Sequence, residues 1–182
     1  PAYPDGDNKV LKKVMKPLIV AAMLAAASMT YAAQGSDGKV IRMVPQADLK
    51  VLDPIWTTAF VTRDHGYMIY DTLFGVDIKG DVHPQMVSTY TKSADGMKWS
   101  FTLRDGLAWH DGHPVTTKDV IPSITRWAQR DGLGQKMFAA VDKFEAVDDK
   151  TFTISFKQPF GMVLQALSKP ASNPPFIMPE SV

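Results

Sequence analysis

The stretch "WHDGHPVT", residues 109–116, contains two histidines, His110 and His113, with an aspartate between them. Imidazole and carboxylate groups at short spacing are common metal ligands, and a bound metal would bring hydrolytic chemistry. Histidine pairs in such sites usually lie one turn apart on a helix, but Gly112 and Pro114 exclude a helix here. The sequence places no third ligand beside them, so a metal-dependent enzyme is only an alternative interpretation.

The same residues fit a rigid turn better than a metal site. Asp111 and Gly112 form a dipeptide that reverses the chain, and Pro114 keeps the exit from the turn extended. Trp109 is large and apolar enough to anchor the turn in a core. We therefore expect an anchored turn with no metal.

Other catalytic patterns are absent from the sequence. It has no Gly-x-Ser-x-Gly, no His-Glu-x-x-His and no phosphate-binding glycine loop, and the adjacent Asp148 and Asp149 are typical of a turn. The absence of cysteine excludes disulfides, thiolate metal sites and a cysteine nucleophile. A net charge of +1 with scattered basic residues gives no field for nucleic acid. We expect a protein without catalytic activity, cofactor or nucleic-acid partner.

The stretch "LDPIWTTAFVTRD", residues 52–64, has the composition of a binding segment. It combines aromatic side chains with threonine hydroxyls and an arginine, directly after a proline that stops regular structure. An extended backbone here could pair with the backbone of a ligand, with Trp56 and Phe60 as walls. The alternative is a loop that packs its own aromatic side chains.

The N-terminal region resembles an export signal. Three lysines precede the apolar run 17–29, and Thr30-Tyr31-Ala32 after it offers small residues at two positions of a cleavage site. The run is shorter than the roughly 20 residues that span a membrane, although an N-terminal anchor is the alternative. We expect residues 15–32 to be a signal peptide cleaved after Ala32, residues 1–14 to be an upstream extension, and residues 33–182 to be exported to the periplasm.

Two hairpins are predicted in the exported part. Alternating apolar and polar residues at 87–92 and 98–103 flank the Asp-Gly pair 95–96, which is the strongest local hairpin signal. A second pair of segments, 143–147 and 151–156, flanks an Asp-Asp-Lys turn.

One long helix is predicted from Thr116 or Thr117 to about Arg130. Thr116 and Asp119 form a capping pair, and apolar residues recur at helical spacing behind them. Pro122 conflicts with this helix because it removes a backbone hydrogen bond, so we expect a kink there.

The remaining predicted elements are short. They are a strand at 39–44, a helix within 63–72, a helix after the "RDGLGQ" segment at 130–135, and a helix at 160–168. Because strands come in hairpins and do not alternate strictly with helices, the sequence predicts an α+β fold.

Residues 93–127 resemble the signature region of bacterial extracellular solute-binding proteins of family 5, the peptide, oligopeptide and nickel receptors of ABC importers. The shared pattern is a hairpin, an aromatic-alternating strand, Leu-Arg-x-Gly, then Trp-x-Asp-Gly-x-Pro-Val-Thr and an arginine-bearing helix. "LDP" at 52–54, "YDTLF" at 70–74 and "VDDKTFTISFKQPF" at 147–160 also match, so the resemblance covers residues 39–182.

This resemblance implies the N-terminal part of a two-lobed, type II-like periplasmic-binding-protein fold with a mixed sheet and hairpins. Residues 33–182 would form the start of lobe I and most of a small extra domain, without the C-terminal lobe. The segment after Leu-Asp-Pro would lie in the cleft, which points to Thr57, Thr58, Ala59 and Phe60 as ligand-binding residues. The expected partners are a peptide or small solute and an ABC permease, with the receptor a monomer; a metal or metallophore receptor of the same family is the alternative.

Overall fold

The computed structural model describes residues 42–182. The expected upstream extension, signal peptide and cleavage site lie outside the described residues. So does half of the strand predicted at 39–44, and the described half, Arg42–Val44, is not in a strand. The chain divides after Val44, and all the helices and strands named below belong to the compact unit Pro45–Val182.

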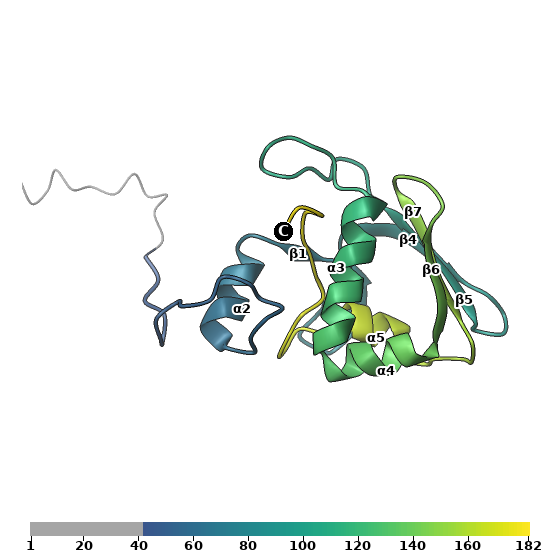
Figure 1. Cartoon of the computed structure of the whole chain (residues 1–182), viewed down its shortest axis with the longest axis horizontal. Coiled ribbons are helices and arrows are strands. Elements are labelled where there is room, and N and C mark those ends of the chain that lie inside the picture. Colours follow the sequence, from purple (N-terminus) through teal and green to yellow (C-terminus); the bar gives the residue numbers. More distant parts are fainter. Residues whose placement is uncertain (1–41) are drawn as a thin grey trace, which may run out of the picture. The chain divides into compact units, whose positions relative to one another are not determined.

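Short helices and antiparallel strands make up this unit (Figure 1). In chain order they are α2 (Phe60–Tyr67), β1 (Asp71–Thr72), β2 (Phe74–Val76), β3 (Val82–Pro84), β4 (Val87–Lys92), β5 (Lys98–Leu103), α3 (Thr117–Arg130), α4 (Gly132–Ala140), β6 (Val141–Ala146), β7 (Thr151–Phe156), α5 (Val163–Leu167) and β8 (Phe176–Ile177). The predicted α+β class is confirmed. No helix among the described residues has both the length and the apolar character needed to span a bilayer.

A four-stranded sheet in the order β4-β5-β7-β6 is the largest element of the fold. Both predicted hairpins are present, and pairing of β5 with β7 joins them. Gly96 has φ +72° at the tip of the first hairpin, and Asp148 Oδ1 accepts hydrogen bonds from Lys150 N (2.8 Å) and Thr151 N (2.7 Å) at the tip of the second. Every described strand pair is antiparallel, so this part of the fold has no mixed sheet.

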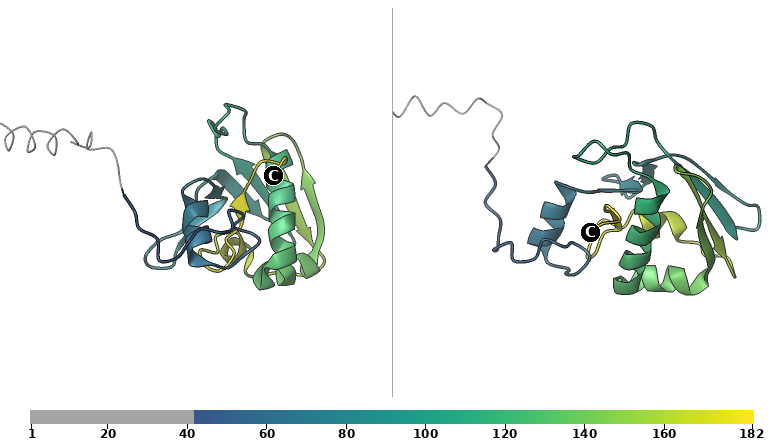
Figure 2. Two further views of the ribbon diagram at one scale, coloured as in Figure 1. Left: turned by 60° about the vertical axis from the view of Figure 1, so that its left-hand side comes forward. Right: turned by 45° about the horizontal axis from the view of Figure 1, so that its top comes forward.

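The core lies between this sheet and α3. Helices α3, α4 and α5 all lie on the same side of the sheet in Figures 1 and 2. Phe101 on β5 and Phe152 on β7 are fully buried and stack with ring centroids 5.1 Å apart. The apolar stripe of α3 includes Ile124 and Trp127, which are also fully buried. Burying each such side chain contributes about 1.5–3 kcal/mol.

Helix α3 begins as the sequence predicts. Thr116 Oγ1 accepts a hydrogen bond from Lys118 N (3.3 Å), and Thr116 N donates to Asp119 Oδ2 (2.9 Å), which completes a capping box. The helix continues through Pro122 to Arg130, and α4 follows directly because the Asp131 carboxylate caps its first amides.

Two helix boundaries differ from the predicted ones. The helix expected within 63–72 begins earlier, at Phe60, and ends at Tyr67, because Asp71–Thr72 instead pair with Phe176–Ile177 in a two-stranded sheet. Helix α5, Val163–Leu167, is shorter than the expected 160–168. The β1–β8 pairing joins segments over 100 residues apart, which no local pattern reveals.

Candidate functional site

The 109–116 stretch forms the predicted turn. Trp109 N donates to His113 O (2.8 Å), Gly112 N donates to Trp109 O (2.9 Å), and Ala108 pairs with Pro114 across the base. Gly112 has φ +87°, a backbone conformation that favours glycine. Trp109 is half-buried against the core, so the turn is anchored as expected.

The two histidines of the turn are both exposed. His113 Nδ1 lies 3.1 Å from Asp111 Oδ2, and both side chains are mostly in solvent. The His113 backbone N–H, followed by its imidazole, lowers the pKa of the Asp111 carboxyl. Across residues 42–182, no group of three histidine, aspartate or glutamate side chains is arranged to hold a metal ion.

Asp119 connects the turn to the rest of the structure. Its Oδ2 accepts a hydrogen bond from the Trp109 indole Nε1 (3.4 Å), and its Oδ1 accepts one from Glu180 N (3.0 Å). The carboxylate therefore fixes the turn, the start of α3 and the chain near residue 180 together. The 109–116 stretch therefore has a structural role in the scaffold.

The five residues expected to bind ligand are consecutive and run from Trp56, the end of a turn at Pro54–Trp56, to Phe60, the first residue of helix α2. Trp56 and Phe60 are 63% and 57% exposed. Thr58 and Ala59 are exposed and Thr57 is half-buried. The segment is irregular up to Ala59, the N-cap of α2. The structure thus keeps all five residues in one accessible segment.

Several main-chain groups of this segment already have partners. Thr57 O accepts a hydrogen bond from the Asn173 side chain (3.0 Å), Ala59 N donates to Thr57 Oγ1 (3.2 Å), and Ala59 O accepts from Arg63 N (3.0 Å). The main-chain N–H and C=O of Thr58 make none of the hydrogen bonds found within residues 42–182. Three other main-chain groups of the segment likewise make none of them: Thr57 N–H, Phe60 N–H and Trp56 C=O. Thr58 is therefore the one residue of the segment with both main-chain groups unpaired within the described part of the chain.

Arginine side chains cover the two aromatic rings of the segment. The Arg130 guanidinium lies 4.0 Å from the centre of the Trp56 ring, and the Arg63 guanidinium lies 4.6 Å from the centre of the Phe60 ring. Arg63 also bonds to the Asp64 carboxylate at 3.3 Å. These cation–π contacts hold the exposed rings.

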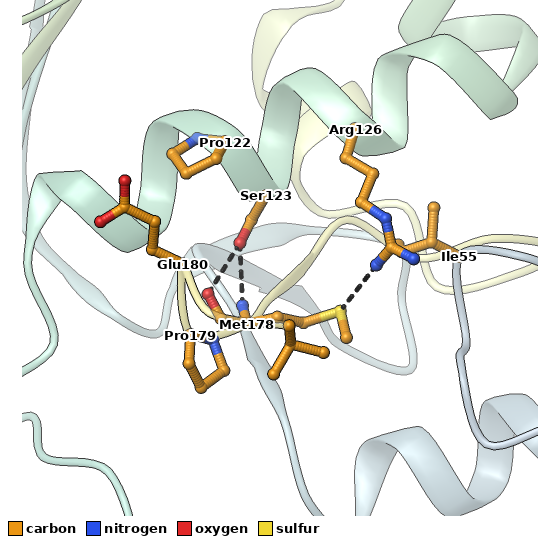
Figure 3. Close-up of a pocket in the computed structure, with 8 residues that line it drawn as sticks. Ile55, Pro122, Ser123, Arg126, Met178, Pro179 and Glu180 are labelled. Carbon is orange, nitrogen blue, oxygen red and sulfur yellow. Dashed lines mark hydrogen bonds between the residues drawn. The ribbon is translucent and has the colours of Figure 1, made fainter.

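Asp53 ties the segment to α3. Its Oδ1 accepts a hydrogen bond from Ile55 N (3.0 Å), its main-chain oxygen accepts one from Trp56 N (3.3 Å), and its Oδ2 pairs with Arg126. Arg126 also contacts Met178 Sδ at 3.7 Å (Figure 3). The Asp53-Pro54 dipeptide therefore anchors the candidate segment, residues 56–60, to α3.

A small cavity lies beside this anchor. It is about 30 Å³ in volume and lies between Ile55, the Pro122–Arg126 turn of α3 and the chain from Met178 onward. Ser123 Oγ closes it by bonding both the oxygen (3.0 Å) and the nitrogen (2.9 Å) of Met178 (Figure 3). Its size suits about one water molecule, so it is a packing gap, not a solute site.

A broader hollow opens along α2. Its volume is about 420 Å³, within the usual range of ligand sites, and Arg63, Tyr67, Phe74, Gln85 and Pro170 are among its lining residues. Because Arg63 also stacks on Phe60, the hollow adjoins the candidate segment.

The sequence alone does not reveal the residues that hold the candidate segment in place. Asp53, Arg126 and Arg130 gave only weak signals, as part of "LDP" and of an arginine-bearing helix. Asn173 gave none, because it lies in a proline-rich run whose composition indicates only extended chain.

Together these features give an accessible segment with exposed aromatic rings, anchored to an α+β scaffold. The fold is that of part of a periplasmic binding protein. The family model described as bacterial extracellular solute-binding proteins, family 5 middle, matches residues 81–181. The chain belongs to this family.

Individual relatives agree with this assignment. The chain is 44% identical over 142 residues to a probable peptide ABC transporter periplasmic-binding protein of Sinorhizobium fredii, covering 78% of this chain and 26% of that protein. It is 28% identical over 153 residues to a glutathione-binding protein of Salmonella typhi, covering 83% and 30%. Among solved structures, the binding protein MoaA of A. tumefaciens R10, in complex with mannopinic acid, matches with a TM-score of 0.63 and 28% identity, covering 74% and 28%. The chain thus spans less than a third of the length of each.

Proposed function

We propose that this chain is part of the substrate-binding component of an ABC importer. It captures peptides or related small solutes in the periplasm and delivers them to a membrane permease, without catalysis. The observation that carries the proposal is the accessible main chain of Thr58 between the exposed rings of Trp56 and Phe60. Two relatives, a probable peptide ABC transporter periplasmic-binding protein and a glutathione-binding protein, support the ligand class.

The chemistry of this segment suits solutes with peptide-like backbones. A free N–H and C=O pair with a ligand main chain whatever its side chains, which gives sequence-tolerant affinity. In the two-lobed arrangement that we propose, residues 33–182 supply one wall and a second lobe supplies the other. Ligand that contacts both walls favours the closed state, which the permease then recognises. The receptor acts as a monomer.

Ligand binding by the full-length protein tests the proposal. Alanine oligopeptides of two to five residues and glutathione are titrated by calorimetry. Thr58→Pro removes the N–H donor and is expected to weaken peptide binding at least tenfold, whereas Thr58→Val keeps the main chain and is expected to change it less than threefold. A Thr58→Pro variant that binds as the parent does would contradict the assignment of this segment.

The metal alternatives rest on the 3.1 Å approach of His113 to Asp111. A metal or metallophore receptor, or a metal-dependent enzyme, would use His110 and His113 as ligands. Titration of the parent and of the double variant His110→Ala, His113→Ala with Zn²⁺ and Ni²⁺ separates them from the peptide receptor. Absence of a metal response in the parent, or the same response in the variant, excludes both alternatives.

Export is tested separately. A cleaved signal peptide predicts that protein isolated from the periplasm begins at Ala33, whereas a membrane anchor predicts that it retains the apolar residues 18–27. N-terminal sequencing distinguishes the two.

A further inference from the structure

Asn173 makes an unusual set of contacts with the candidate segment. Its side chain is buried, and its Nδ2 lies 3.1 Å from Pro54 O, 3.0 Å from Ile55 O and 3.0 Å from Thr57 O. The two N–H hydrogens of this amide are therefore shared among three carbonyls of an irregular stretch more than 110 residues earlier in the chain. Because that stretch forms no strand or helix, these carbonyls have no ladder partners of their own.

Asn173 is itself held in place by the core. Its main-chain oxygen accepts a 2.7 Å hydrogen bond from the indole Nε1 of Trp127, a fully buried residue of α3. Ser172, directly before it, has φ +61° and is the one non-glycine residue with positive φ in the described part of the chain. The left-handed conformation turns the chain at this point, and sharp constraints of this kind are maintained only where the surroundings require them.

The hydrogen bond from Asn173 to Thr57 also determines where Thr58 points. The Thr57 C=O and the Thr58 N–H belong to one planar trans peptide, in which the two groups point in opposite directions. Because the buried Asn173 amide draws the carbonyl inward, the N–H of Thr58 must face outward, toward solvent.

We propose that Asn173 is the positioning residue of the ligand segment: it presents the Thr58 amide as a donor without itself contacting the solute. This inference rests on the proposed function and narrows it. The solute must offer a carbonyl or carboxylate oxygen at this point of the cleft, as a peptide main chain does. The Arg130 guanidinium, which stacks on Trp56, adds positive charge beside the segment that favours the same oxygen.

The test uses Asn173→Asp in the full-length protein. Aspartate keeps the shape but replaces the donor with an acceptor facing three carbonyls. Peptide affinity is expected to fall at least tenfold, and the amides of Ile55 and Trp56 to exchange faster with solvent while those of β5 remain protected. Gln165→Glu, the same amide-to-acid change at an exposed site on α5, is the matched control and is expected to change neither.

A double variant distinguishes positioning from general support. If Asn173 acts through the Thr58 amide, then adding Asn173→Asp to Thr58→Pro weakens binding no further. Additive losses, or an Asn173→Asp variant that binds within twofold of the parent, would overturn the inference. If the parent binds none of the peptides or glutathione, the proposed function fails. Hydrogen exchange then still decides the inference: unchanged rates at Ile55 and Trp56 contradict it, and a rise confined to them supports it.

Discussion

At the scale of single residues, the turn at 109–116 depends on its glycine and tryptophan and not on its histidines. Gly112 has φ +87°, and Trp109 donates through its indole to Asp119, which caps α3. His110 and His113 are exposed, and His113 pairs with the nearby Asp111 carboxylate. The two histidines, which suggested a metal site in the sequence, thus contribute least to the structure of the turn.

This difference predicts unequal effects of substitution in the turn. Gly112→Ala forces a Cβ into a left-handed conformation and is expected to lower the free energy of unfolding by about 1 kcal/mol. His110→Ala, at an exposed side chain, is expected to change it by less than about 0.5 kcal/mol. Urea denaturation measures both, and equal effects would contradict the turn described here.

Ser172 gives a second residue-scale prediction. A β-branched side chain fits φ +61° poorly, so Ser172→Val is expected to destabilise the fold by about 1–2 kcal/mol. Ser172→Gly relieves the same strain but increases the freedom of the unfolded chain, so it is expected to be within about 1 kcal/mol of the parent. Thermal unfolding of the two variants provides the comparison. If Ser172→Val unfolds at the same temperature as Ser172→Gly, this prediction is wrong.

At the scale of elements, α2 packs so closely that a glycine is required. A Cβ on Gly66 would lie 2.9 Å from the Phe176 ring of β8 and 3.0 Å from the Pro54 side chain. Gly66→Ala is therefore expected to cost about 1–3 kcal/mol of unfolding free energy and to loosen the ligand segment. Gly132→Ala at the start of α4, where an added Cβ meets open space, is the matched control and is expected to be neutral or slightly stabilising. Chemical denaturation of both variants tests the contrast.

Helix α3 tolerates a proline that its own hydrogen bonding disfavours. Pro122 is exposed and lies inside the helix, where it cannot donate to the carbonyl of Lys118. Pro122→Ala is expected to stabilise the fold by about 1–2 kcal/mol, less than the full helix penalty because proline also restricts the unfolded chain. A higher midpoint in urea would support this, and a lower one would show that the ring is needed for packing.

The predictability of these elements follows the range of their interactions. The hairpin at 87–103 could be predicted because its turn needs positive φ at Gly96 and its faces alternate, both of which are local properties. The cap of α3 is equally local, since Thr116 and Asp119 are three residues apart. The end of α2 and the role of Asn173 could not be predicted, because each depends on partners more than 100 residues away. The composition of residues 52–64 indicates the candidate segment, whereas the residues that anchor it are apparent only in the structure.

At the scale of the whole described unit, α3, α4 and α5 lie on one side of the main sheet, and several of the turns contain an aspartate. The pKa of each of these exposed turn carboxyls is lowered from the ordinary value of 3.8: Asp77, Asp95, Asp105, Asp111 and Asp148. The leading cause at Asp95 is the hydroxyl of Ser93, at Asp105 it is Lys150, and at the other three it is a backbone N–H in the turn. The turns of the three hairpins, at Asp77, Asp95 and Asp148, and the β5–α3 connection, at Asp105 and Asp111, therefore favour the ionised carboxylates.

This preference predicts a fold that loses stability in acid. A carboxyl whose pKa is lower in the folded than in the unfolded chain binds fewer protons when folded, so it stabilises the fold above the unfolded pKa. That contribution disappears as pH falls through 3.8 and then through the lower folded values. The urea midpoint is expected to be level from pH 7 to about 5 and to fall steadily below it. Asp95→Asn combined with Asp148→Asn keeps residues that suit turns but cannot ionise, so the acid loss should be shallower in the double variant. An equally steep loss in that variant would place the acid sensitivity elsewhere in the chain.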